Sequence, residues 1–400
     1  MARSMLTLPN RPPIEPSRLA PVLAPLGRAR TLPAEAYTSR EVFDWERRHF
    51  FEDSWVCVGR ASNVANPGDR VAVRAGDEGV LLVRGADGEL RGFFNVCRHR
   101  GHELVPCGES ANGHAVTCPY HGWVYGLDGR LRASPRFGHL PPSDAVHEGL
   151  VPVRTAIWNG WVFVNASGDG PPLETAHVGN LDELVRPYDP AGLVACAWHE
   201  YEVEANWKLV VENYHECYHC PQIHPELCRV TPTESGSNFE PVGLWAGGSM
   251  DLEPHAETMS LDGRSGGEPL PGLDPHHRRL VFYFGLFPNL LLSLHPDYVM
   301  THRIEPLGPA RCRIECEWLF PAGAAGRKGF DPSYAVEFWD LTNRQDWQLS
   351  ELAQQGISSR GYQPGPYSNR EELLQALDRF VLERTSGSPA GRPDPARSPA

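Results

Sequence analysis

Positive charge and long apolar runs are both scarce in this 400-residue sequence. Its 37 lysines and arginines, of which only two are lysines, are outnumbered by 50 aspartates and glutamates, so the net charge is −13. Phosphate backbones repel a negative protein, which argues against a nucleic-acid partner. No stretch is long and apolar enough for a transmembrane helix, and the N-terminal residues lack the apolar core of a secretory signal. We therefore expect a soluble, cytoplasmic protein with no membrane partner.

The cysteines do not indicate a disulfide-stabilised protein. Ten of them in 400 residues is ordinary usage. Cys196, Cys217, Cys220 and Cys228 cluster without the regular spacing of a disulfide framework. A reducing compartment is the simplest setting for such a sequence.

The chain is long enough for two domains with separate cores. Residues 1–37 are rich in Pro and Arg, and we expect a flexible segment there. Thr38 and Glu41 form a potential capping box for a helix over residues 38–53 that packs on the second domain. Residues 385–400 consist mainly of Ser, Pro, Gly and Arg and are predicted to be a disordered tail.

Residues 54–166 and 167–384 differ in pattern. Short apolar runs broken by Gly and Asp turns fill the first range and predict a small antiparallel β domain. The second range is mixed, so the fold class is α+β, with a larger domain in which helices surround an antiparallel sheet. Its predicted elements are a helix over 206–218, a long loop over 247–275, strands over 280–287, 290–295, 298–304 and 311–320, and helices over 331–356 and after the capping box Ser368/Glu371.

Two mixed Cys/His pairs lie in the predicted β domain. One residue separates Cys97 from His99, two separate Cys118 from His121, and 18 residues lie between the pairs. One class of [2Fe–2S] cluster is held by two thiolates on one iron and two imidazoles on the other. The two pairs supply these four ligands. Structural zinc sites also use two Cys and two His, but they usually pair like with like. The mixed pairs therefore favour the cluster over zinc.

A second set of potential ligands lies in the larger domain. Glu216 and His219 are three residues apart and would share a helix face. His224 would reach the same point only if the helix broke between the two histidines, and Pro221 supplies a break. Two imidazoles need a carboxylate to complete the facial triad of a non-haem Fe(II) site. We select Asp346, which flanks the apolar stripe of the long C-terminal helix, against the alternative of a solvated helical acid.

Over about residues 38–383 the sequence resembles the oxygenase α subunits of Rieske non-haem iron oxygenases. The two Cys/His pairs match the cluster motif of that family, and His219, His224 and Asp346 match its mononuclear iron ligands. Within the family, the chain resembles glycine betaine monooxygenase and the relatives that demethylate stachydrine or carnitine. The runs that carry this similarity are residues 95–101, 212–220, 294–303 and 342–347.

The resemblance implies a homotrimer with a [2Fe–2S] Rieske cluster and a mononuclear Fe(II) in each chain. Electrons would come from NAD(P)H through a separate flavin- and [2Fe–2S]-containing reductase, and would pass from the cluster of one subunit to the iron of the next. In related dioxygenases an aspartate three residues before the first iron histidine bridges the two sites. Glu216 occupies that position here, with Glu212 as the competing choice, and Asn213 of the same run is a second candidate catalytic residue.

The implied function is a monooxygenase that uses O₂ to hydroxylate an N-methyl group of a small quaternary ammonium compound resembling glycine betaine, releasing formaldehyde. Trp245, Tyr283, Phe284 and Tyr298 could form a cation–π cage for the ammonium group, although such residues are also common in protein cores. One alternative is an aromatic-ring-hydroxylating oxygenase. Another is an electron-transfer Rieske protein or a structural zinc module, neither of which would need the second metal site.

Overall fold

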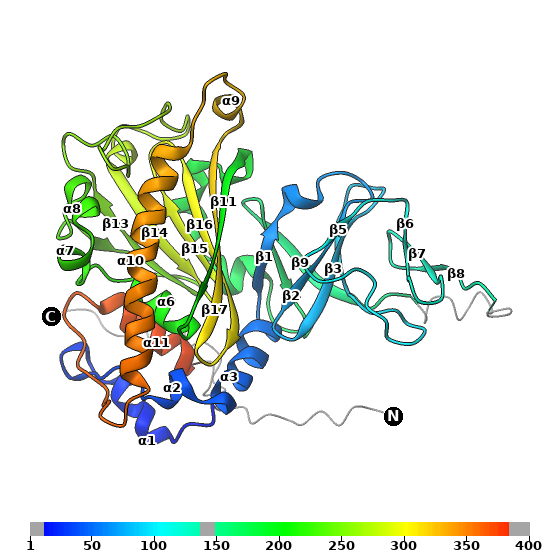
Figure 1. Ribbon diagram of the computed structural model, residues 1–400, viewed down its shortest axis with the longest axis horizontal. Coiled ribbons are helices and arrows are strands. Elements are labelled where there is room, and N and C mark those ends of the chain that lie inside the picture. The colour runs from blue at the N-terminus through cyan, green and yellow to red at the C-terminus, as the bar shows by residue number, and fades with distance from the viewer. Residues whose placement is uncertain (1–11, 137–148, 384–400) are drawn as a thin grey trace, which may run out of the picture.

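The computed structural model describes residues 12–136 and 149–383. Two units lie side by side, a small β domain and a larger mixed domain (Figure 1). The tail predicted over residues 385–400 lies outside the described residues. Within the described ranges, no helix is both long enough and apolar enough to cross a bilayer.

The β domain contains a seven-stranded antiparallel sheet, with a three-stranded sheet at its far end (Figure 1). Glycines with positive φ occupy its hairpin turns, among them Gly88 between β3 and β4 with a φ of 83° and Gly129 between β7 and β8 with a φ of 79°. Glycine takes such φ values without steric cost. The seven strands follow the order β1-β10-β9-β4-β3-β2-β5, and the three follow β6-β7-β8. Their bounds are β1 (Val56–Arg60), β2 (Arg70–Ala75), β3 (Glu78–Arg84), β4 (Leu90–Phe94), β5 (Ser110–Ala111), β6 (Ala115–Thr117), β7 (Val124–Gly126), β8 (Leu131–Ala133), β9 (Pro152–Trp158) and β10 (Trp161–Asn165).

The larger domain is built on a second seven-stranded antiparallel sheet, in the order β11-β17-β16-β15-β14-β13-β12. All four strands predicted between residues 280 and 320 are present. In β17, Cys312, Ile314 and Cys316 are fully buried while the residues between them are only partly buried, which is the predicted alternation. The strands are β11 (Leu193–Val203), β12 (Ser237–Asn238), β13 (Trp245–Asp251), β14 (Leu280–Leu286), β15 (Leu290–Leu294), β16 (Val299–Gly308) and β17 (Arg311–Pro321).

The start of the loop predicted over residues 247–275 is instead strand β13, which pairs along its length with β14. Gly247 and Gly248 resemble loop residues in the sequence but lie inside this strand. A Cβ atom on Gly247 would come within 2.2 Å of the Tyr283 carbonyl oxygen, so only glycine allows the two backbones to approach this closely.

Helix α10 (Ser333–Ile357) crosses the face of this sheet in Figure 1 and buries Phe338 and Trp347. It begins two residues later than predicted, with Asp331 Oδ1 accepting a hydrogen bond from the Ser333 amide (2.9 Å). The helix predicted over 206–218 is also shorter, because α6 ends at Tyr214 and a loop follows. The helices of this domain are α5 (Leu181–Val185), α6 (Trp207–Tyr214), α7 (Cys220–Ile223), α8 (Pro225–Val230), α9 (Ala322–Ala325), α10 and α11 (Glu372–Glu383), with short turns η5 (Glu174–Val178), η6 (Arg186–Tyr188), η7 (Pro190–Gly192) and η8 (His277–Arg279).

The described part of the N-terminal segment is ordered, contrary to our prediction of flexibility over residues 1–37. Val22 and Leu32 are buried, and the Gln375 side chain of α11 donates hydrogen bonds to the carbonyls of Val22 and Ala24, each at 2.8 Å. These contacts offset the entropy of ordering, which composition alone does not reveal. The elements are α1 (Pro16–Leu19), η1 (Ala20–Leu23), η2 (Leu26–Arg28) and α2 (Glu35–Thr38).

The predicted capping box is displaced by one residue. Ser39, not Thr38, caps helix α3 (Arg40–Glu46), because its Oγ accepts a hydrogen bond from the Val42 amide (3.4 Å). Thr38 Oγ1 donates instead to the Ala34 carbonyl (2.9 Å). The helical turns η3 (Arg47–Glu52) and η4 (Ala61–Val64) flank β1 and complete the connection to the β domain.

A buried ion pair joins α3 to α6. Lys208 Nζ lies 2.7 Å from Glu46 Oε1, and each side chain is 2% exposed. Trp207 Nε1 also donates to Glu46 Oε2 (2.9 Å). Burial raises the pKa of Glu46, and the neighbouring ammonium group partly opposes that rise. The pair thus fixes helix α6, and the loop that follows it, against the N-terminal helix.

Replacing Lys208 with methionine is expected to destabilise the protein by about 3–5 kcal/mol, because the Glu46 carboxylate would stay buried without a counter-ion. The free energy of unfolding of the K208M variant, measured by urea denaturation, tests this. Lys328 is exposed, so K328M is a matched control that should lie within about 0.5 kcal/mol of wild type. Equal stability of the two variants would contradict a structural role for the ion pair.

Candidate metal centres

The two Cys/His loops of the β domain are close copies of each other. The Cys97 carbonyl accepts a hydrogen bond from the Gly101 amide, and the Cys118 carbonyl accepts one from the Gly122 amide, each at 3.0 Å. Gly101 and Gly122 have φ values of 72° and 71°, a conformation that favours glycine. Each loop therefore presents its cysteine and its histidine from the same kind of turn.

The four predicted cluster ligands converge at the tip of the β domain. Cys97 and Cys118 are buried and contact each other, while the ring centroids of His99 and His121 lie 4.6 Å apart. His121 is exposed. Tyr125 Oη lies 3.2 Å from Cys97 Sγ, the kind of contact that tunes a cluster's reduction potential. Two buried thiols beside two imidazoles, of which His121 is exposed and His99 partly buried, fit a two-iron cluster in which Cys would hold one iron and His the other.

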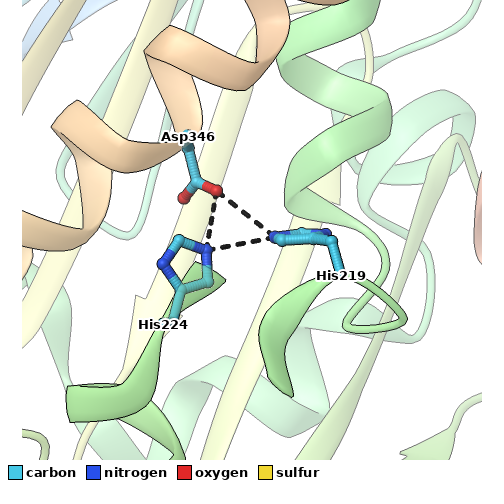
Figure 2. Close-up of side chains that lie close together, drawn as sticks. All are labelled: His219, His224 and Asp346. Atoms are coloured by element: carbon cyan, nitrogen blue, oxygen red, sulfur yellow. Dashed lines mark hydrogen bonds and ion pairs between the residues drawn. The ribbon is translucent and has the colours of Figure 1, made fainter. Parts of the chain in front are cut away.

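Three side chains of the larger domain meet at one point (Figure 2). His219 Nε2 lies 3.1 Å from His224 Nε2 and 3.3 Å from Asp346 Oδ1. The distance from His224 Nε2 to Asp346 Oδ1 is 2.9 Å. Two imidazole nitrogens and one carboxylate oxygen so close together are the donor set of a facial triad.

The two histidines flank a one-turn helix. His219 directly precedes α7, and His224 directly follows it. The prediction that one helix would carry His219 up to a break at Pro221 was therefore wrong: α6 ends earlier, and Pro221 lies in the first turn of α7, a favourable position for proline. Asp346 does lie on the predicted long helix, α10.

Two carboxylates surround His219. Burial alone would lower its pKa, but hydrogen bonds to Asp346 and Glu216 outweigh burial and raise the pKa to about 9. Burial would raise the pKa of Asp346, yet its contacts with His219 and His224 hold that pKa below its usual range. The site thus favours a positive charge at its centre and fits a divalent metal ion.

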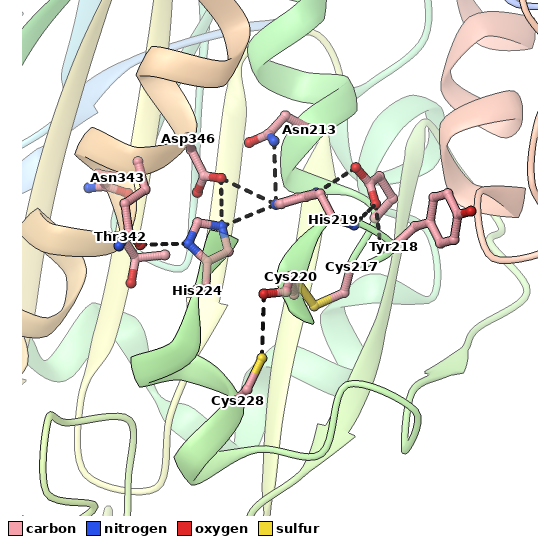
Figure 3. Close-up of polar contacts among 12 residues, drawn as sticks. Asn213, Cys217, Tyr218, His219, Cys220, His224, Cys228, Thr342, Asn343 and Asp346 are labelled. Carbon is pink, nitrogen blue, oxygen red and sulfur yellow. Dashed lines mark hydrogen bonds and ion pairs between the residues drawn. A yellow bond between two sulfur atoms is a disulfide. The ribbon is translucent and has the colours of Figure 1, made fainter. Parts of the chain in front are cut away.

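Each imidazole of the triad has a partner on its other nitrogen (Figure 3). His219 Nδ1 lies 2.6 Å from Glu216 Oε1, and His224 Nδ1 lies 2.7 Å from Gln345 Oε1. Asn213, the other predicted catalytic residue, is more distant, with its Nδ2 3.5 Å from His219 Nε2. Gln345 was missed in the sequence, where its one signal is that it directly precedes a predicted metal ligand.

Glu212, the competing choice for the bridging residue, belongs to a different buried cluster. Tyr37 Oη donates to Glu212 Oε1 (2.9 Å), and the Glu212 side chain also contacts that of Asp378. Burial raises the pKa of both carboxyl groups, to about 7 for Asp378. Two carboxyl groups in contact hold a proton between them. This geometry favours Glu216 over Glu212 as the carboxylate that acts beside the metal.

The triad opens onto a cavity of about 370 Å³. Tyr214, Tyr283 and Trp339 contribute aromatic rings to its wall. Tyr283 is the one member of the predicted aromatic cage that lines this cavity. The other three are fully buried in the core: Trp245, Phe284 and Tyr298. Tyr214 and Trp339 were missed because their positions depend on how α6 and α10 pack on the sheet.

A disulfide joins Cys217 to Cys220, one on each side of His219 (Figure 3). We did not predict a disulfide from the cysteine spacing, and this bond corrects that prediction. Cys228 Sγ also donates a hydrogen bond to the Cys220 carbonyl (3.4 Å). The bond closes a small ring around a metal ligand and restrains the loop between α6 and α7.

Removing one ligand of the triad should leave the cluster in place, because the two sites use separate side chains. We expect wild-type protein purified without oxygen to be red-brown, with about three irons and two acid-labile sulfides per chain. Asp346→Ala and His219→Ala should each retain about two irons and the cluster spectrum but lose turnover. Asp340→Ala, on the same helix, is the control and should keep all the iron. Stoichiometric zinc without colour, or loss of the cluster in the two ligand variants, would contradict the assignment.

Models of two protein families match this chain. The Rieske [2Fe-2S] domain matches residues 54–144, and the ring hydroxylating alpha subunit (catalytic domain) matches residues 191–387. The glycine betaine monooxygenase oxygenase subunit of Chromohalobacter salexigens is 34% identical over 373 residues, covering 86% of this chain and 83% of the relative. The carnitine monooxygenase oxygenase subunit of Escherichia coli K12 is 38% identical over 201 residues, covering 49% of this chain and 53% of that relative.

Solved structures share the fold over nearly the whole chain. A structure of the quaternary ammonium Rieske monooxygenase CntA matches with a TM-score of 0.79 and 24% identity, covering 94% of this chain and 99% of that one. Naphthalene 1,2-dioxygenase from Rhodococcus matches with a TM-score of 0.74 and 20% identity, covering 94% and 98%. The match to a catalytic domain overturns the alternatives of an electron-transfer protein and a zinc module. This chain belongs to the Rieske non-haem iron oxygenases, as an oxygenase subunit with a Rieske domain and a catalytic domain.

Proposed function

We propose that this oxygenase hydroxylates an N-methyl group of a small quaternary ammonium compound and thereby releases formaldehyde. The cavity beside the triad is the observation that carries the proposal, because its wall combines aromatic rings with carboxylates. A relative that is 34% identical, a glycine betaine monooxygenase oxygenase subunit, supports this substrate class.

The charges around the cavity suit a cationic substrate. Glu216, Glu234 and Asp346 line it, whereas Arg370 is the one Arg or Lys among the described lining residues. Arg370 is itself paired with Glu234, at 2.8 Å. The rings of Tyr283 and Trp339 offer the electron-rich faces on which an ammonium group binds. A quaternary ammonium group would thus find cation–π contacts in this cavity and no unpaired Lys or Arg among its described lining residues.

The residues of the chain orient the substrate and confine the reaction. Iron held by His219, His224 and Asp346 would supply the oxygen chemistry. The aromatic wall would turn one N-methyl group toward the open side of the triad and exclude water from it. Hydroxylation by O₂ converts a C–H bond of that methyl group to C–OH, while two electrons from the reductase and two protons convert the other oxygen atom to water. The C–N bond then breaks, the nitrogen keeps the electron pair, and formaldehyde and a proton leave.

The positions of the two metal sites support electron transfer between subunits of a homotrimer. The cluster loops beside β6–β8 and the triad beside α7 and α8 lie at opposite ends of the molecule (Figure 1). Beside these sites, Tyr120 and Tyr218 are 52% and 60% exposed, so both regions are open to contact with another subunit. Electrons from NAD(P)H would enter through a separate flavin and [2Fe–2S] reductase, reach the cluster, and cross to the triad of the next subunit through His121 and Glu216.

Turnover with NAD(P)H and a generic reductase should release one formaldehyde per demethylated product from at least one of glycine betaine, stachydrine, carnitine and choline. The D346A variant supplies the blank. Aromatic acids in the same panel test the alternative reaction, since hydroxylated arenes without formaldehyde would contradict the proposal. A neutral analogue of the active substrate, with carbon in place of the ammonium nitrogen, tests the cation–π contacts. We expect it to bind about 30-fold more weakly than the substrate, because it loses about 2 kcal/mol of cation–π attraction.

Glu216→Gln should keep both metals bound and the cluster reducible, but slow electron delivery to the iron by about 10–100-fold, because the carboxylate that holds His219 loses its charge. Rapid mixing of the reduced protein with substrate and oxygen, followed at the cluster absorbance, measures this step. Glu226→Gln, on the neighbouring helix α8, is the matched control. A wild-type rate of cluster reoxidation in E216Q would rule out the bridging role and return attention to Glu212.

A further inference from the structure

The two imidazoles of the triad are held by chemically different partners. His219 donates its Nδ1–H to the Glu216 carboxylate at 2.6 Å, whereas His224 faces the neutral Gln345 amide at 2.7 Å. His219 is partly accessible, with 17% of its side chain exposed, while the His224 side chain is 2% exposed. The contact with Gln345 thus holds the less accessible of the two imidazoles.

The direction in which the His224 ring faces decides which of its nitrogens carries the proton that Gln345 accepts. Its Nε2 points at Asp346 Oδ1 and at His219 Nε2, where a metal ion would lie (Figure 2). A nitrogen that binds a metal must present a lone pair, so the ring proton must sit on Nδ1. Nδ1–H then donates to Gln345 Oε1, since an amide oxygen is always an acceptor. The contact therefore selects the tautomer that can bind metal.

We propose that Gln345 is a positioning residue for the iron ligand His224. The inference rests on the assignment of His219, His224 and Asp346 as the iron ligands. Gln345 and Asp346 are consecutive on α10 and diverge by about 100° around the helix. They contact opposite nitrogens of the same ring, so one helix fixes the His224 imidazole from both sides.

A neutral partner also limits the negative charge of the site. Glu216 and Asp346 already place two carboxylates around the imidazoles. A third carboxylate at position 345 would make His224 a stronger donor and would favour the more highly charged, ferric state of the iron. An amide at position 345 fixes the His224 ring without favouring ferric iron. In the proposed function, electrons would still arrive through Glu216 and His219.

The test measures iron affinity rather than activity. Gln345→Met has a similar length but no oxygen acceptor, and we expect it to bind Fe(II) about 10–100-fold more weakly in competition with a chelator, as removal of such partners usually does. Gln345→Glu keeps an acceptor and should retain the metal at least as tightly as wild type. Gln348 is exposed on the same helix, so Gln348→Met is the matched control and should bind Fe(II) normally.

Two further readouts separate this role from simple misfolding. The cluster absorbance of every variant should match wild type, and the EPR signal of the nitric oxide adduct of the ferrous site should change in Q345M but not in Q348M. Wild-type affinity in Q345M, or equal loss of iron in Q345M and Q345E, would overturn the proposal. Neither result depends on the substrate or on electron transfer, so both remain informative if the proposed demethylation is wrong.

Discussion

Asp346 lies beside two histidines from a distant part of the sequence, and the site depends on the buried contacts between them. Its Oδ1 is 2.9 Å from His224 Nε2 and 3.3 Å from His219 Nε2. A buried carboxylate needs a positive partner, and a metal ion at this point would satisfy the carboxylate and both imidazoles at once. Three interactions hold these side chains close together: the packing of α10 on the sheet, the ion pair that fixes α6, and the disulfide beside His219. The geometry thus comes from three elements, each restrained by a different kind of interaction.

The second constraint is the distance between the two metal sites. The cluster loops form the tip of the β domain, and the triad lies at the far end of the other domain (Figure 1). An electron cannot cross a whole domain as readily as it crosses one carboxylate between two imidazoles. In the proposed assembly, another subunit would bring its exposed His121 next to Glu216. The fold of a single chain accounts for metal binding, and the proposed assembly accounts for electron flow.

The local parts of both sites could be predicted from the sequence, and the parts that depend on packing could not. Cys97, His99, Cys118 and His121 lie in short turns whose spacing carries the chemistry, and their convergence needs only two hairpins. Gln345 and Trp339, by contrast, matter because of what α10 faces, which periodicity does not specify. Likewise the Pro-rich residues 12–37 are ordered by burial against α11, and Gly247 occupies a strand because a neighbouring backbone passes close by. The fold class was correct because alternation such as that of β17 is a local signal.

Transfer of electrons between subunits is the central claim, and mixed oligomers test it most directly. Cys118→Ala chains, which lack the cluster, and Asp346→Ala chains, which lack the iron, should each be inactive alone. Co-assembly of equal amounts should restore about one quarter of wild-type activity, because random mixing places an intact cluster beside an intact triad at that fraction of subunit contacts. Mixed oligomers that stay inactive, although each chain retains its remaining metal, would contradict the account.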